Sequence, residues 1–103
     1  MIIKERSDLD PESEFVKIVV DTEKGILSHG CELHIDCYEE LVKDGSEPKN
    51  LWGANVYPKD KTIAYVSMVN IRPKKGNDDM EVKNLEIRNK MEIIGTHFLI
   101  GYP

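Results

Sequence analysis

The feature that most constrains the fold is a pair of apolar, β-branched segments separated by a tight turn. Residues 15–20 read Phe-Val-Lys-Ile-Val-Val, and residues 26–35 alternate apolar and polar side chains. The intervening residues 21–25 end in a glycine, which supplies the positive φ that short hairpin loops require. Because strands favour β-branched residues and alternate their side chains between two faces, the pattern predicts an antiparallel hairpin.

Further elements follow from the same kind of pattern. Residues 51–57 predict a strand, and residues 62–72 predict the longest strand of the chain, ended by a proline that cannot donate to a ladder. Asp36 and Glu39 have the spacing of a capping box, which predicts a helix over residues 37–43.

The last helix is predicted to begin after Asn84, a good N-cap residue. One apolar face recurs at helical spacing through Ile87, Met91, Ile94 and Phe98. Gly95 weakens a helix, so residues 96–103 are expected to form an extended tail. A third, very short helix is expected after Asp10.

Strands joined by short turns predict a mainly antiparallel sheet, and the apolar helix faces need a sheet to cover. We therefore expect a two-layer α+β fold, with two or three short helices packed on one face. A length of 103 residues suits one domain spanning residues 1–103.

Charge excludes some classes of partner. The chain has 14 Lys plus Arg against 19 Asp plus Glu, a net charge of −5, whereas binders of nucleic acid or anionic membranes usually carry a basic surface. No apolar run approaches the roughly 18–20 residues that span a bilayer, and the first residues lack the layout of a signal peptide. The sequence therefore predicts a cytoplasmic protein without nucleic-acid or membrane partners.

The two cysteines are expected to be free. If residues 31–35 are extended, the Cα atoms of Cys31 and Cys37 lie on the order of 15–20 Å apart. A disulfide tolerates about 7 Å at most. Free thiols fit a reducing compartment, and the absence of paired Cys or His ligands argues against zinc, so no metal or cofactor is expected.

Strand alternation suggests a polar site on one sheet surface. If the predicted strands over residues 26–35, 51–57 and 62–72 are neighbours, an acid, an imidazole, amides, a phenol and a guanidinium converge there: Glu32, His34, Asn55, Tyr57, Asn70 and Arg72. Asn77 and Glu81, in and after the next loop, would close over such a site.

Two interpretations of this surface stay open. His34 titrates near neutral pH and could act as a general acid or base with Glu32 beside it, while Arg72 could hold a carboxylate or phosphate. Alternatively, this is the ordinary polar face of an antiparallel sheet, with Glu32 and Arg72 forming a cross-strand ion pair.

Three motifs carry a family resemblance: Gly-x-Glu-Leu-His from residue 30, Leu-Trp-Gly-x-Asn-x-Tyr-Pro from residue 51, and Asn-Ile-Arg-Pro-x-x-Gly-Asn-x-x-Met-Glu from residue 70. Over roughly Asp21 to Met91 the chain resembles a small prokaryotic family classed as a domain of unknown function. The resemblance rests on these motifs and implies no activity, because the family has no established one.

Three functional hypotheses follow. The preferred one is a small binding or interaction protein, with a homodimer as one form, whose polar surface takes a small anionic ligand or a partner. The second is an enzyme of hydrolase or lyase type with His34 and Glu32 as catalytic candidates. The third is a structural subunit of a homo-oligomer in which the apolar face of the last helix is shared between chains.

Overall fold

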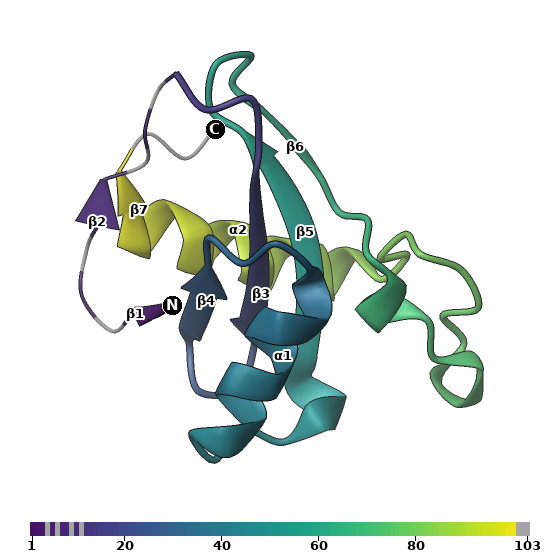
Figure 1. Cartoon of the computed structure of the whole chain (residues 1–103). Coiled ribbons are helices and arrows are strands. Elements are labelled where there is room, and N and C mark those ends of the chain that lie inside the picture. The colour runs from purple at the N-terminus through teal and green to yellow at the C-terminus, as the bar shows by residue number, and fades with distance from the viewer. Residues whose placement is uncertain (4, 6, 9, 11, 101–103) are drawn as a thin grey trace.

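The computed structural model describes residues 1–3, 5, 7–8, 10 and 12–100. Its main sheet has the strand order β1–β4–β3–β5–β6, and every neighbouring pair is antiparallel (Figure 1). The strands are β1 (Ile2–Ile3), β3 (Val16–Asp21), β4 (Ile26–His29), β5 (Leu51–Tyr57) and β6 (Thr62–Ala64). A second, parallel pair joins β2 (Ser7–Asp8) to β7 (Leu99–Ile100). The α+β class and the antiparallel sheet are confirmed.

The predicted β3–β4 hairpin forms, but β4 is shorter than the alternation suggested. The turn carries Gly25 at φ +67°, and the carboxylate of Asp21 accepts hydrogen bonds from the backbone N–H groups of Glu23 and Lys24. β4 ends at His29 because Gly30 adopts φ +77°, which turns the chain out of the sheet. The predicted strand is therefore wrong beyond residue 29.

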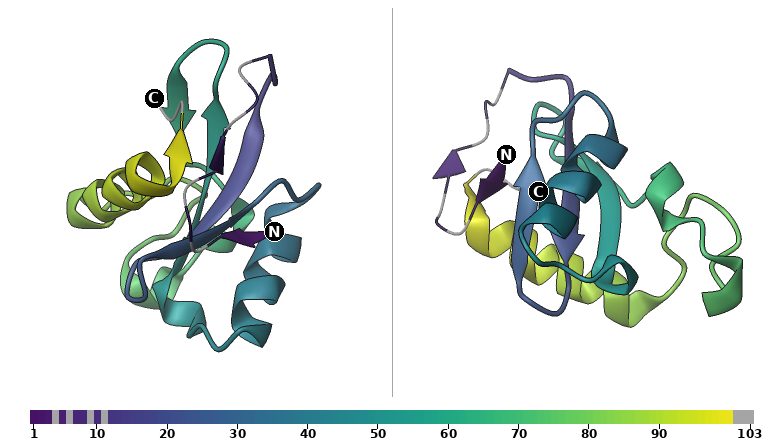
Figure 2. Two further views of the ribbon diagram at one scale, coloured as in Figure 1. Left: turned by 90° about the vertical axis from the view of Figure 1, so that its left-hand side faces the viewer. Right: turned by 60° about the horizontal axis from the view of Figure 1, so that its bottom comes forward.

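The two helices cover opposite faces of the sheet, as Figure 2 shows. Val19 of β3 packs with Cys37 and Leu41 of α1 (His34–Lys43), whereas Ile18 and Val20 pack into the larger core beneath α2 (Leu85–Phe98). The predicted placement of the helices on one face is therefore wrong. β3 is a central strand buried on both sides, so its run of apolar residues serves two layers of packing.

The last helix begins as predicted, with the Asn84 side chain accepting from the backbone N–H groups of Glu86 and Ile87. It continues through Gly95 to Phe98 and leads into β7, so the expected extended tail is wrong for residues 96–98. Residues 101–103 lie outside the described residues, as does Pro11 in the short helix expected after Asp10. Gly95 is buried within this helix, so its low helix propensity does not end the element there.

The face of α2 expected to be shared between chains is used within this chain. Met91 and Ile94 belong to the core, and Ile87 and Phe98 pack against it. That helix face is therefore not free to form the interface of an oligomer.

The predicted long strand over residues 62–72 is wrong after Ala64. β6 pairs with β5 over three residues only, and the chain then forms an isolated bridge between Val66 and Glu81. Two short 3-10 helices follow, η2 (Met68–Asn70) and η3 (Pro73–Lys75), and an earlier one, η1 (Pro48–Asn50), precedes β5. The apolar residues of this segment line a loop rather than one face of a strand.

The two cysteines form a disulfide, which overturns the expectation of free thiols. The Cα atoms of Cys31 and Cys37 are 5.8 Å apart, within the range a disulfide needs. The predicted separation was wrong because α1 begins at His34, three residues earlier than the capping-box pattern indicated. The N-cap residue is Leu33, whose side chain cannot cap the helix, so the disulfide holds this helix start.

Candidate functional site

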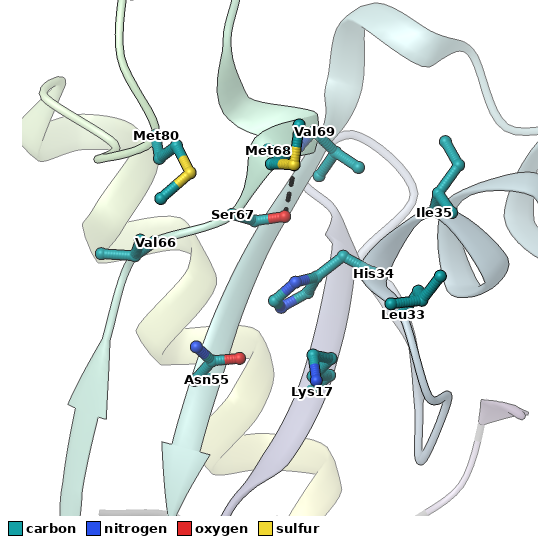
Figure 3. Close-up of a pocket in the computed structure, with 10 residues that line it drawn as sticks. All are labelled: Lys17, Leu33, His34, Ile35, Asn55, Val66, Ser67, Met68, Val69 and Met80. Carbon is teal, nitrogen blue, oxygen red and sulfur yellow. Dashed lines mark hydrogen bonds between the residues drawn. The ribbon is translucent and has the colours of Figure 1, made fainter.

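A pocket of about 630 Å³ opens on the α1 side of the sheet (Figure 3). Strands β3 and β5 form its floor. Residues 33–35, at the start of α1, form one side, here called the α1 wall. Residues 66–69 with Met80 form the other, here called the loop wall. The lining residues are Lys17, Leu33, His34, Ile35, Asn55, Val66, Ser67, Met68, Val69 and Met80.

The floor places a cation beside an amide. Lys17 of β3 and Asn55 of β5 are directly opposed in the antiparallel register, so their Cβ atoms are neighbours on one face. No ion pair joins Lys17 to a described carboxylate, and its Nζ lies 4.6 Å from the ring centroid of Phe15. Lys17 therefore offers the pocket a positive charge that no described carboxylate neutralises.

Asn55 contributes an unsatisfied hydrogen-bond acceptor. Its Oδ1 is buried and has no hydrogen-bond partner among the described residues. Buried polar groups in native proteins are almost always paired, because an unpaired one loses its hydration without replacement. This oxygen is therefore free to accept a hydrogen bond from an N–H or O–H donor.

His34 is fixed at the edge of the floor by the backbone. Its Nε2 donates to the carbonyl oxygen of Ala54 at 2.8 Å, so that nitrogen carries a proton. Burial lowers the pKa of His34 below its usual 6.5; the hydrogen bond to Ala54 opposes this shift, and the charge of Lys17 adds to it. The imidazole is therefore mainly neutral at pH 7, with Nδ1 as an acceptor.

Ser67 adds a buried hydroxyl on the loop wall. Its Oγ accepts from the backbone N–H of Val69 at 3.2 Å, which leaves the hydroxyl proton to donate elsewhere. Gly53 allows this close approach, since a Cβ on that residue would lie 2.6 Å from the Cβ of Ser67. The polar ends of Ser67, His34, Asn55 and Lys17 occupy the middle of the view in Figure 3.

The rest of the pocket is apolar, and much of it reaches solvent. Leu33 is 58% exposed and Met68 75% exposed, and Ile35 and Met80 are also exposed large hydrophobic residues. Clustered exposed apolar side chains commonly mark a binding surface, and methionine adapts its shape to different ligands. The rim of the pocket is therefore an exposed apolar surface.

Of the predicted site residues, the structure brings His34 and Asn55 together in the pocket. Tyr57 lies two residues beyond Asn55 on the same face of β5, where its ring centroid is 6.0 Å from that of Phe15. Glu32 is exposed in the segment before α1 and does not line the pocket.

Asn70 and Asn77 are buried, and their side-chain amides bind backbone. The Oδ1 of Asn70 accepts from the N–H of Gly53 at 2.7 Å, and its Nδ2 donates to the carbonyl oxygens of Gly53 and Met80. Asn77 donates to the carbonyl oxygens of Asn70 and Glu81 and accepts from the N–H of Lys83. These two residues support the loop wall from behind.

Arg72 and Glu81 are likewise engaged elsewhere. The guanidinium of Arg72 donates to the carbonyl oxygens of Lys49 and Leu51 and stacks on Trp52, 4.1 Å from its ring centroid. Burial lowers the pKa of Arg72, although an arginine stays charged at neutral pH. Glu81 forms an ion pair with Arg88. Arg72 therefore does not line this pocket, where Lys17 is the charged lining residue.

Sequence reasoning missed Lys17, Ser67, Met68 and Met80. Lys17 interrupts the apolar run of residues 15–20, which was a signal, but its position opposite Asn55 depends on a strand order that the sequence left open. Met68 lies in the segment over residues 62–72 that a strand pattern misassigned, and Met80 lies beyond that segment. No local pattern indicates that the two methionines would line the same wall of one pocket.

Within the described part of the chain, no group of three or more His, Cys, Asp or Glu side chains is placed to bind a metal ion. None of the helices there is long and apolar enough to cross a bilayer.

The fold and the pocket define a small α+β protein with a mainly apolar pocket and a polar floor. The chain belongs to a family described as proteins of unknown function, DUF5674, whose sequence profile matches residues 4–98. This match confirms the resemblance to an uncharacterised domain family and extends it toward both ends. Comparisons with curated proteins and with solved structures found no match.

Proposed function

We propose that this protein binds a small carboxylate that has an apolar body, in the pocket between the α1 wall and the loop wall. The observation that carries the proposal is the pairing of an uncompensated Lys17 with the unsatisfied Asn55 oxygen on the floor of an apolar pocket. The pocket volume lies within the range of about 300–1,000 Å³ that small-molecule sites occupy.

Charge and shape both favour this class of ligand. A carboxylate gains a charge-assisted hydrogen bond from Lys17, and none of the lining residues is an acid that would repel it. The exposed apolar residues of both walls would lose solvent contact when an aliphatic group packs against them. The ligand therefore combines one negative charge with a branched or extended hydrocarbon part.

A second candidate function is catalysis with His34 as a general base. One observation favours it: Nε2 is fixed on the carbonyl oxygen of Ala54, and burial keeps the imidazole neutral. Glu32 lies outside the pocket, so the predicted acid partner takes no part. The test is hydrolysis of a carboxylate ligand that also carries an ester or amide group. If His34→Gln abolishes this turnover but keeps the affinity for the ligand, the enzyme is favoured over the binding protein.

Isothermal titration of isocaproate against its neutral counterpart isocaproamide tests the proposal. We expect the carboxylate to bind the wild-type protein about tenfold more tightly, because only the carboxylate gains the charged hydrogen bond. Lys17→Met should remove that preference. Lys90→Met is the matched control, since Lys90 is exposed on α2, on the opposite face of the sheet.

Equal affinity for the two ligands would overturn the proposal, and so would an equal effect of Lys17→Met and Lys90→Met. The cytoplasmic location and the homodimer remain predictions. The disulfide removes the argument from free cysteines for a reducing compartment, which leaves the location resting on the other sequence features.

A further inference from the structure

Three polar groups of the pocket form a set that one kind of carboxylate can satisfy. Lys17 offers positive charge, Asn55 Oδ1 needs a donor, and the hydroxyl of Ser67 can donate. A plain fatty carboxylate satisfies the lysine alone and would leave the asparagine oxygen buried and unpaired. The complete ligand must therefore carry a donor and an acceptor near its carboxylate.

Charge narrows the choice of donor. An ammonium group would supply N–H donors, but Lys17 lies directly across the strand pair from Asn55 and would repel it. The N–H of an amide donates without carrying charge. Its carbonyl oxygen is also the acceptor that a serine hydroxyl can bind.

Resting on the proposed function, we infer that the ligand is an acylamino carboxylate with an apolar side chain. Its chemistry is that of an N-acylated apolar amino acid: the carboxylate on Lys17, the amide N–H on Asn55 Oδ1 and the acyl carbonyl on Ser67. The apolar side chain packs between the α1 wall and the methionines of the loop wall. Both N-acyl amino acids and peptide carboxyl termini have this chemistry.

The decisive experiment compares two ligands that differ in one atom. N-acetyl-leucine has the amide N–H, and the acetyl ester of leucic acid has an oxygen in its place with nearly the same shape. We expect the wild-type protein to bind the amide about tenfold more tightly in isothermal titration, because the ester oxygen leaves Asn55 without a donor. The measurement needs no variant, so it cannot fail through misfolding.

Asn55→Leu sharpens the test. The ratio of affinities for the two ligands should fall toward one in this variant, since the acceptor is gone. The matched control is Asn89→Leu, at an exposed position on α2, which should keep the wild-type ratio. A wild-type ratio that survives in Asn55→Leu would overturn the assignment.

Failure of the inference and failure of the proposed function give different results. If the amide and the ester bind equally well, or if only isocaproate binds, the inference is wrong and the proposed function stands. If none of the three carboxylates binds, the proposed function fails as well.

An acetylated tripeptide ending in leucine distinguishes a peptide carboxyl terminus from a free N-acyl amino acid as the source of the ligand. Tighter binding than N-acetyl-leucine supports a peptide terminus, and equal or weaker binding supports the free acylated amino acid.

Discussion

The two walls of the pocket are held in place by different kinds of bond. The α1 wall is a helix start without a side-chain cap, and the covalent bond between Cys31 and Cys37 encloses it. The loop wall includes the start of η2, and hydrogen bonds from the buried amides of Asn70 and Asn77 tie the segment behind this wall to β5 and to itself. Neither wall depends on a long regular element.

Because the bonds differ, each wall withstands different changes. A covalent bond resists the loss of neighbouring contacts but depends on the oxidation state of the cysteines. Buried amide hydrogen bonds are insensitive to oxidation but depend on the identity of single residues, since an unpaired buried partner is costly. Reduction of the disulfide should therefore disturb the α1 wall alone, and loss of a buried amide should disturb the loop wall alone.

Removal of the Asn70 amide should have the largest effect. Asn70→Ala leaves the N–H and carbonyl of Gly53 and the carbonyl of Met80 without their partner, and we expect a loss of about 3 kcal/mol in the free energy of unfolding. Urea denaturation measures it. Asn89→Ala, at an exposed helix position, is the control and should change stability by less than about 0.5 kcal/mol. A loss below about 1 kcal/mol for Asn70→Ala would contradict this account of the loop wall.

Opening of the disulfide should come second. Reduction, or the double change Cys31→Ala and Cys37→Ala, should cost about 2 kcal/mol, because the bond closes a short loop and restricts the unfolded chain less than a long one would. Hydrogen exchange should speed up at the first turn of α1 while the amide of Gly53, which donates to Asn70, stays protected. A reductant should not change the double variant. Equal loss of protection at both walls would show that they are not separable.

Acidification should have the smallest effect, and it should act on the α1 wall. The pKa of His34 is lowered in the folded protein, mainly by burial, so the unfolded chain binds a proton more readily. Stability should therefore fall as pH drops through 6.5 and level off below the folded pKa. His29, whose pKa is also lowered by burial, adds to the same trend.

His34→Gln tests this share of the pH dependence, because glutamine can still donate to the carbonyl oxygen of Ala54 but does not titrate. Thermal unfolding between about pH 7.5 and about pH 5.5 should show a weaker dependence on pH in the variant than in the wild type. An unchanged dependence would show that His34 does not contribute to it.

Local patterns predicted the elements that depend on local chemistry. The β3–β4 turn, the bounds of β5 and the Asn84 cap follow from glycine, proline and asparagine acting on their own neighbours. Tyr57 and Asn55 were also placed correctly on one face, because alternation holds along an unbroken strand.

The site itself was only partly predictable, since it depends on where strands stop. Gly30 ends β4 and allows His34 to begin a helix, which no alternation pattern can indicate. The strand pattern places Asn70 on the polar face of a strand over residues 62–72, although asparagine has poor strand propensity. Its side chain instead takes the place of a neighbouring strand along the edge of β5. The poor strand propensity of Asn70 therefore coincides with a long-range hydrogen bond to the backbone of Gly53.

A ligand bound between the two walls should change the environment of nearby methionines, and three of the four methionines in the chain can report it. Methyl-labelled methionine NMR can follow Met68 and Met80 in the loop wall and Met91 in the core on the opposite face, during titration with N-acetyl-leucine. We expect saturable chemical-shift changes at Met68 and Met80 and an unchanged signal from Met91. Shifts at Met91 alone, or no shift at Met68 and Met80 at saturating ligand, would contradict binding between the two walls.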